Sequence, residues 1–303
     1  MGLCMSRPRL LLIANPNASR CREGLGPAVS ALAMAGFDIN LRCPASSEAI
    51  AGVIASEGGE AEAVVVAGGD GTVNAAADAL IACGRPVGLL PLGTANDLAL
   101  TLGIPQDPVA AAAVIADGAP RAIDVGRANG HAFVNVASIG LSVKIAERQD
   151  PVRKQQWRTL SYLITTLRVL GEADRFAARI TCDGQSVDVE AYQIAVGNGV
   201  HYGGGLTVAE NAAIDDGLLD VYAIEAGSLA EVVGLAPALL IGTQGRSTAV
   251  TTLRGRHVVI ETERPMPVNT DGEVTTETPV EMNVERGALR VYAPPVEMPE
   301  PTS

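Results

Sequence analysis

Residues 63–80 read AVVVAGGDGTVNAAADAL. The apolar run at the start is typical of a buried parallel strand, and the alanine-rich run at the end is typical of a helix. Glycines at such a junction let a ligand approach the backbone closely, and free amides with the helix dipole can bind an anion there. The stretch therefore predicts a phosphate-binding turn between a strand and a helix.

A second strand end carries a similar polar loop. Residues 89–100 read LLPLGTANDLAL, with Gly93 and Thr94 just after the apolar run. Taken alone, the first stretch could equally be a tight turn capped by Asp70 and Thr72. Two such loops at neighbouring strand ends outline one crevice, which is where open α/β sheets bind ligands. The pair therefore favours a binding site, although neither GxxxxGK[ST] nor GxGxxG occurs.

The alternation of elements predicts the fold class. The first third of the chain alternates apolar strands with helices, which indicates a parallel sheet covered on both faces. After residue 122 the pattern changes to short strands around Asn129-Gly130 and Asp183-Gly184, which are strong hairpin signals.

We expect an α/β domain over residues 1–122 and a mostly antiparallel β-sandwich domain over residues 123–293. The tail, residues 294–303, is expected to return to the first domain. Two helical segments, residues 152–171 and 228–242, are expected to interrupt the second domain.

Composition excludes several classes of function. The net charge of −12 argues against nucleic acid as a partner, because binding to a phosphate backbone needs clustered Lys and Arg. The five cysteines are scattered and never form CxxC, which favours reduced thiols over a disulfide framework or a zinc site. No apolar run reaches membrane-spanning length and no signal-peptide pattern is seen, so we expect a cytoplasmic protein.

A late acidic motif offers a candidate for catalysis. Asp271-Gly272-Glu273 sets two carboxylates two positions apart, where a strand would place them on one face. Phosphoryl transfer to an alcohol needs a carboxylate that can accept the hydroxyl proton. Asp-Gly is also a common hairpin turn, so a purely structural role stays open.

A second acidic motif lies earlier in the same domain. Asp215, Asp216 and Asp220 gather around Gly217. Hard cations bind carboxylate and carbonyl oxygens on such turns. An ordinary acidic turn between strands is the alternative, and the residues alone favour it.

Together these motifs resemble the diacylglycerol kinase catalytic domain superfamily, in particular its soluble bacterial lipid kinases. The resemblance is carried, in chain order, by NPNAS (15–19), GGDGTVNAAADAL (68–80), PLGTANDLA (91–99), VGNGVHYGGGLTVAENAAIDDGLLDVYAI (196–224) and MPVNTDGE (266–273). It extends over almost the whole chain. It implies a phosphofructokinase-like nucleotide domain, a β-sandwich that receives a lipid, ATP as co-substrate, and Mg²⁺.

The resemblance also implies roles for individual residues. Glu273 would accept the proton and Asp271 would flank the transferred phosphoryl group, while Asp216 and the backbone carbonyls of Ala213 and Leu218 would hold a structural Mg²⁺. The residues implied to line the nucleotide are Asn15, Asn17, Gly68, Gly69, Asp70, Gly71, Thr72 and Thr94. Arg42 and Cys43 occupy the place where a nucleotide-contacting threonine is often found in the family, so the chain departs from the family pattern there.

Two other functions remain open at this point. GGDGT is shared with NAD kinases, so a kinase of a soluble metabolite such as NAD is one rival, and a nucleotide- or lipid-binding module without turnover is another. The acceptor is equally open among diacylglycerol, phosphatidylglycerol, a sphingoid base and a polyketide-like alcohol. The oligomeric state is open too, a homodimer included.

Membrane contact is a further open question. The basic residues Arg148, Arg153, Lys154 and Arg158 begin an amphipathic pattern that could meet an anionic membrane surface. Such a stripe more often packs on its own domain. Peripheral membrane association is therefore the minority interpretation.

Overall fold

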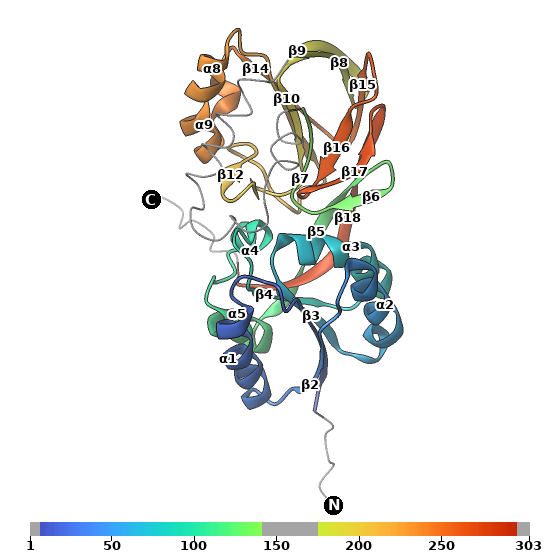
Figure 1. Ribbon diagram of the computed structural model, residues 1–303, viewed down its shortest axis with the longest axis vertical. Coiled ribbons are helices and arrows are strands. Elements are labelled where there is room, and N and C mark those ends of the chain that lie inside the picture. The colour runs from blue at the N-terminus through green and yellow to red at the C-terminus, as the bar shows by residue number, and fades with distance from the viewer. Residues whose placement is uncertain (1–6, 141–174, 296–303) are drawn as a thin grey trace, which may run out of the picture.

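The computed structural model describes residues 7–140 and 175–295 of the 303-residue chain, and these form two lobes (Figure 1). The N-terminal lobe contains a parallel sheet in the order β2-β1-β3-β4. Its strands are β1 (Arg9–Ala14), β2 (Asp38–Arg42), β3 (Ala63–Gly68) and β4 (Val87–Pro91). The expected α/β class is confirmed.

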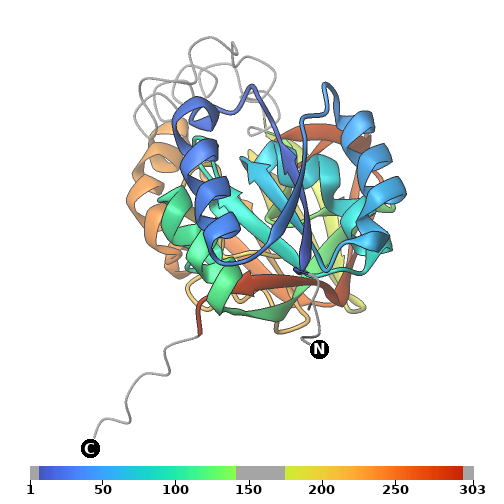
Figure 2. The same ribbon diagram turned by 90° about the horizontal axis from the view of Figure 1, so that it is seen from below.

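Helices cover both faces of this parallel sheet, as Figure 2 shows from below. On one face lie α1 (Cys21–Met34) and α5 (Pro108–Asp117), and on the other lie α2 (Ser47–Glu57) and α3 (Asp70–Cys83). The short helices η1 (Gly58–Glu60) and α4 (Asp97–Thr101) lie between these elements in the chain. Strands β1, β3 and β4 are buried, which explains their continuous apolar sequences, whereas the edge strand β2 is exposed or half-buried.

Local signals explain where the helices begin and end. The side chain of Ser46 accepts a hydrogen bond from the amide of Ala49 at the start of α2, and Asp107 does the same for Ala110 in α5. Gly84 ends α3 in the left-handed region, with φ of 66°.

The C-terminal lobe is a sandwich of two antiparallel sheets. One is six-stranded, in the order β14-β13-β10-β7-β16-β17, and the other is the far part of the larger sheet, in the order β18-β15-β8-β9. Their facing side chains form one buried cluster, including Ile139 and Val221 from the first sheet and Ile180 and Met282 from the second.

The strands of the C-terminal lobe have these bounds: β5 (Ala119–Ala128), β6 (His131–Phe133), β7 (Val136–Gly140), β8 (Phe176–Cys182), β9 (Gln185–Ala191), β10 (Gln193–Gly197), β11 (His201–Tyr202), β12 (Leu206–Thr207), β13 (Leu219–Ile224), β14 (Val250–Gly255), β15 (His257–Thr262), β16 (Pro267–Thr270), β17 (Glu273–Glu277) and β18 (Val280–Ala293). The two hairpins expected from Asn-Gly and Asp-Gly form with left-handed turns. Asn129 and Gly130 have φ of 47° and 89°, and Asp183 and Gly184 have 47° and 85°.

One long strand, β18, joins the lobes. Val291 near its end pairs in parallel with Val87 of β4, while Met282 near its start pairs with Val258 of β15. β5 runs antiparallel to β18 along most of its length. The boundary expected near residue 122 therefore falls inside β5 and stays a prediction. The strand that returns to the first lobe is β18, and residues 296–303 of the expected returning tail lie outside the described residues.

The expected helix over residues 228–242 is two helices, α8 (Leu229–Gly234) and α9 (Ala236–Ile241), followed by η2 (Gln244–Arg246). Pro237 lies in the first turn of α9. It has no backbone N–H and so cannot donate the hydrogen bond that a continuous helix would need at that position. The other expected helix, residues 152–171, lies outside the described residues. Within the described part of the chain, no helix is long and apolar enough to cross a membrane.

Candidate active site

Three loops at the carboxyl ends of β1, β3 and β4 lie side by side. The amide of Leu92 donates to the carbonyl of Gly68 at 2.9 Å, and the amide of Arg20 donates to the carbonyl of Leu92 at 3.0 Å. The amide of Asn15 donates to the carbonyl of Ala67 at 3.0 Å. The crevice predicted from the two glycine-containing stretches is therefore one continuous set of loops.

The glycines of these loops are needed by the fold as well as by any ligand. A Cβ on Gly69 would lie 2.9 Å from the Cα of Gly93, and a Cβ on Gly93 would lie 2.3 Å from the Cα of Gly69. A Cβ on Gly68 would meet the side chain of Thr72 at 2.5 Å. Neither Gly68 nor Gly69 has a positive φ, so close backbone approach rather than left-handed geometry explains them. Gly71 differs, because a Cβ there would meet no atom within 4 Å.

Small polar side chains connect the loops. Asn15 donates to the hydroxyl of Thr72 at 3.1 Å, and its own side-chain oxygen accepts from the amide of Asn17 at 2.9 Å. The hydroxyl of Thr94 lies 3.4 Å from that of Ser19. The structure thus brings together the residues predicted to line the nucleotide, and their roles in binding it stay predictions.

Two aspartates stand at the starts of the helices that follow these loops. One Asp70 carboxylate oxygen accepts from the amide of Leu98 at 3.3 Å, and one Asp97 oxygen accepts from the amide of Gly204 at 2.9 Å. The other oxygen of Asp97 is buried without a hydrogen-bond partner among the described residues. Burial, reinforced by the charge of Asp70, raises the pKa of Asp97 to about 7. Burial also raises the pKa of Asp70, against the opposing effect of backbone amides.

Sequence reasoning places Asp97 in the second polar loop of the crevice but assigns it no role of its own. The signal was available, because Asp97 is the first residue of α4 after Asn96 just as Asp70 is the first residue of α3 after Gly69. The partner amide of Gly204 belongs to the β11–β12 hairpin of the other lobe, which cannot be placed from local sequence. A second contact, from the amide of His201 to the hydroxyl of Thr101 at 3.1 Å, also joins this hairpin to α4.

The Asp-Gly-Glu motif is a hairpin turn, and Asp271 lies close enough to Asp70 for their charges to interact. Asp271 and Gly272 occupy the turn between β16 and β17 with φ of 49° and 101°, and Glu273 is the first residue of β17. The Asp271 carboxylate accepts from three backbone amides, those of Val134, Asn135 and Val136, at 2.6, 2.9 and 2.9 Å.

The carboxylate of Asp271 is therefore committed to holding the loop before β7, which favours a positioning role over direct contact with the phosphoryl group. Burial raises the pKa of Asp271 to about 6, and the charge of Asp70 contributes to this shift. Glu273 is exposed to solvent. This exposure leaves Glu273 free for the predicted role as proton acceptor.

The predicted structural magnesium site does not fit its surroundings. One oxygen of Asp216 accepts from the amide of Leu218 at 2.9 Å, and the other is paired with the guanidinium of Arg254. Within residues 7–140 and 175–295, no group of three or more His, Cys, Asp or Glu side chains is arranged to hold a metal ion. The assignment to Asp216 with Ala213 and Leu218 stays a prediction that this geometry does not favour.

Comparisons with known proteins cover both lobes. Residues 9–128 match the family model described as diacylglycerol kinase catalytic domain, and residues 135–293 match the YegS C-terminal NAD kinase beta sandwich-like domain. A Pseudomonas aeruginosa protein named "Probable lipid kinase YegS-like" is 35% identical over 234 residues, which is 76% of each chain. A Mycobacterium tuberculosis protein named "Diacylglycerol kinase" is 33% identical over 240 residues, which is 77% of each chain.

The fold has solved counterparts as well. A crystal structure of a diacylglycerol kinase from Bacillus anthracis str. Sterne superposes with a TM-score of 0.78 at 26% identity. The match covers 95% of this chain and 98% of that chain. The similarity therefore extends to the arrangement of the two lobes and is not confined to the nucleotide loops.

Proposed function

Because this chain belongs to the diacylglycerol kinase family of lipid kinases, we propose that it transfers the γ-phosphoryl group of ATP to the hydroxyl group of a diacylglycerol-like lipid. The O–P bond to the leaving ADP breaks and a new O–P bond forms to the lipid oxygen. The hydroxyl proton passes to a carboxylate. The products are a lipid phosphate and ADP.

One observation supports this proposal most strongly. The side chain of Asn74, in the first turns of α3, donates to the carbonyl of Thr270 at 3.4 Å. α3 begins at the GGDGT loop, and Thr270 directly precedes the turn that leads to Glu273. The link connects the strand that leads to the candidate base with the helix that follows the proposed nucleotide loop, which supports transfer to an acceptor in the crevice.

The phosphates would be bound mainly by backbone. α3 directs its N-terminal amides toward the crevice, and the open space beside Gly71 allows close approach of a ligand. The arginine in these loops, Arg20, donates from its guanidinium to the carbonyl of Gln106 at 2.8 Å. Amides and helix dipole are therefore the principal groups that this chain offers to the triphosphate.

A divalent cation that accompanies the nucleotide fits the donors at the crevice. The carboxylates of Asp70 and Asp97 would hold it, and one oxygen of Asp97 has no hydrogen-bond partner among the described residues. Mg²⁺ characteristically binds through one or two carboxylates together with substrate phosphates. When bound, it supplies positive charge that offsets the charge on the phosphoryl oxygens.

Glu273 would accept the hydroxyl proton, and Asp271 would position it. A lipid hydroxyl is a weak nucleophile at neutral pH, and a positioned base typically accelerates such transfers by ~10²–10⁴-fold. The three amides bound to Asp271 fix the turn one residue before Gly272 and so restrict where Glu273 can lie.

The acceptor is tested directly by incubating the protein with γ-labelled ATP, MgCl₂ and mixed micelles of diacylglycerol, phosphatidylglycerol or a sphingoid base, with NAD in a parallel reaction. We expect label in at least one lipid and none in NAD. Label in NAD alone would contradict the lipid acceptor while leaving the nucleotide site intact.

A further inference from the structure

The turn that contains Asp215 and Asp216 has its own source of positive charge. We propose that Arg254 of β14 serves as a built-in cation for this turn, so that the fold of this chain does not depend on a structural divalent ion there. The proposal goes beyond the kinase activity and does not depend on it. It concerns the turn that leads into β13 of the second lobe.

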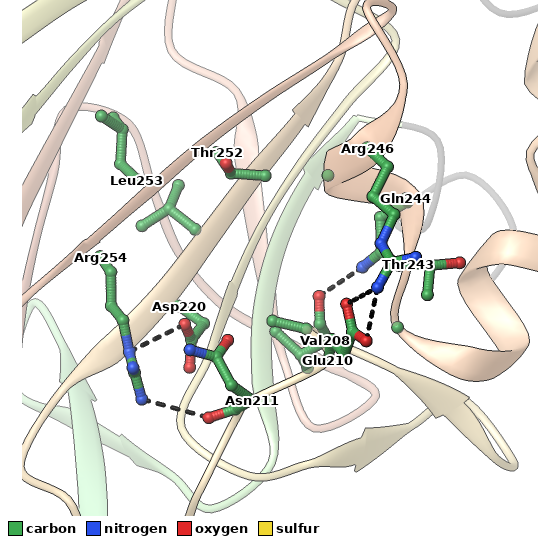
Figure 3. A pocket seen from close by; sticks show the side chains of 14 residues that line it. Val208, Glu210, Asn211, Asp220, Thr243, Gln244, Arg246, Thr252, Leu253 and Arg254 are labelled. Atoms are coloured by element: carbon green, nitrogen blue, oxygen red, sulfur yellow. Dashed lines mark hydrogen bonds and ion pairs between the residues drawn. The ribbon is translucent and has the colours of Figure 1, made fainter.

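The guanidinium of Arg254 bridges two carboxylates. It pairs with one oxygen of Asp216, and its Nε lies 3.1 Å from a carboxylate oxygen of Asp220. Nη2 also donates to the carbonyl of Asn211 at 3.3 Å. Figure 3 shows the contacts of Arg254 with Asp220 and Asn211. The planar guanidinium group is suited to this bridging role, because its several N–H donors reach two carboxylates and a carbonyl at once.

The turn's sequence and the pairing of β13 with β14 place these groups together. Asp220 and Arg254 are direct cross-strand partners, and opposite charges in such a position attract. The side chain of Asp220 is only 10% exposed, and that of Arg254 is 32% exposed. The pair is therefore less screened by water than a surface ion pair.

Two further carboxylates, that of Asp215 in the turn and that of Asp124 in β5 beside it, also have partners. Asp215 pairs with Arg121 at 2.5 Å, and Asp124 accepts from the amides of Gly217 and Gly287, both at 2.7 Å. The side chain of Arg286 lies against Gly217, where a Cβ would be 2.5 Å from its Nε. Each of these carboxylates thus has an arginine or a backbone amide of this chain as partner. Burial raises the pKa of Asp220, and the charge of Arg254 acts against that shift.

A neighbouring arginine provides a matched control. A cavity of about 340 Å³ is lined by Arg254 and Asp220 and also by Arg246 and Glu210 (Figure 3). Arg246 pairs with both oxygens of Glu210 at 2.7 Å, but the two side chains are 72% and 56% exposed. An exposed pair of this kind contributes little to stability.

The test is the melting temperature of nucleotide-free protein in EDTA and in millimolar MgCl₂. Arg254→Gln should melt roughly 4 °C or more below wild type in EDTA, because two carboxylates then face each other without a counter-charge. Mg²⁺ should recover a large part of that loss, and the recovery should disappear in Arg254→Gln combined with Asp216→Asn. Arg246→Gln should shift the melting temperature by less than about 1 °C.

The response of the wild-type protein to Mg²⁺ tests the proposal even if Arg254→Gln does not fold. We expect that MgCl₂ raises the melting temperature of wild type and of Asp216→Asn by the same amount, because no ion is bound through Asp216. A gain in wild type that Asp216→Asn abolishes would overturn the proposal, because an ion would then hold the turn. An Arg254→Gln variant as stable as wild type in EDTA would overturn it as well.

Discussion

At the scale of single residues, Gly71 is the position at which the proposed phosphate binding can be tested separately from folding. Gly68, Gly69 and Gly93 are each constrained by neighbouring atoms, so a substitution there would disturb the loops themselves. Gly71 is exposed, lies in the first turn of α3, and has open space where a side chain would begin. A change at Gly71 can therefore obstruct a phosphate without straining the protein.

We predict that Gly71→Ala keeps or slightly raises the stability and weakens ATP binding by about tenfold or more, which corresponds to roughly 1.4 kcal/mol. Alanine favours a helix over glycine by roughly 0.5–1 kcal/mol, so the fold should not suffer. Gly52→Ala, at an equally open and exposed position in α2, is the control and should leave binding unchanged. Titration calorimetry with ATP measures both, and equal affinity for all three proteins would show that the loop is only a turn.

Asp97 should make stability depend on pH in a defined direction. Its folded pKa of about 7 lies above the ordinary value of 3.8, so the protonated form stabilises the native state. The stability that protonated Asp97 contributes is fully present below about pH 4 and is lost as the pH rises through 7. The charges that raise the pKa after burial are those of Asp70 and Asp271.

We therefore predict that Asp97→Asn gains stability relative to wild type as the pH rises from about 5 to 8, by on the order of 2–4 kcal/mol, since each pKa unit corresponds to about 1.4 kcal/mol. Denaturant unfolding of the nucleotide-free proteins across that range measures the difference. A difference that is constant with pH would mean that Asp97 is ionised throughout.

At the scale of elements, the β16–β17 turn shows what sequence can and cannot resolve. Asp-Gly could be read as a hairpin or as part of a catalytic motif, and the turn is a hairpin that lies beside the crevice. The three amides that commit Asp271 to a positioning role come from residues 134–136, more than 130 positions away. Local pattern carries no information about such a distant contact.

We predict that Asp271→Asn lowers stability by roughly 2–4 kcal/mol, because an amide group cannot accept all the hydrogen bonds that the carboxylate accepts. Activity should fall with it, as the turn that holds Glu273 loosens. Thermal melting and turnover should be measured on the same preparation. Full activity in a variant with normal melting would contradict the positioning role.

In the helices too, features set by neighbouring residues could be predicted from the sequence, whereas contacts with distant residues could not. Caps at Ser46 and Asp107 were predictable because each acts on an amide three residues away. The break between α8 and α9 had a visible cause in Pro237, yet the apolar pattern on both sides suggested one helix. The contact of Gly204 with Asp97 had no local signal at all.

At the scale of the whole molecule, β18 determines how the lobes depend on each other. Val280 and Met282 at its start belong to the buried cluster of the sandwich, whereas Leu289 and Val291 near its end belong to that of the N-terminal lobe. The change from alternating elements to hairpins predicted two lobes correctly. That a single strand completes both could not be predicted, because strand pairing over such separations depends on the assembled sheet.

We predict that the lobes unfold together. Met282→Ala and Leu289→Ala remove buried side chains from different clusters, and each should cost about 2–5 kcal/mol. Scanning calorimetry should show one transition that moves down in both variants. Two separate transitions, only one of which moves in each variant, would show that β18 does not couple the lobes.

Turnover of Glu273→Gln tests most directly whether Glu273 accepts the hydroxyl proton in the proposed phosphoryl transfer to a lipid. Glutamine keeps the size of the side chain but cannot take the proton at neutral pH. With γ-labelled ATP and the lipid micelle that wild type phosphorylates, we predict a fall in turnover of about 10²-fold or more, with ATP affinity and melting temperature close to wild type. Turnover equal to wild type would contradict the claim and leave Glu273 a structural residue of the turn.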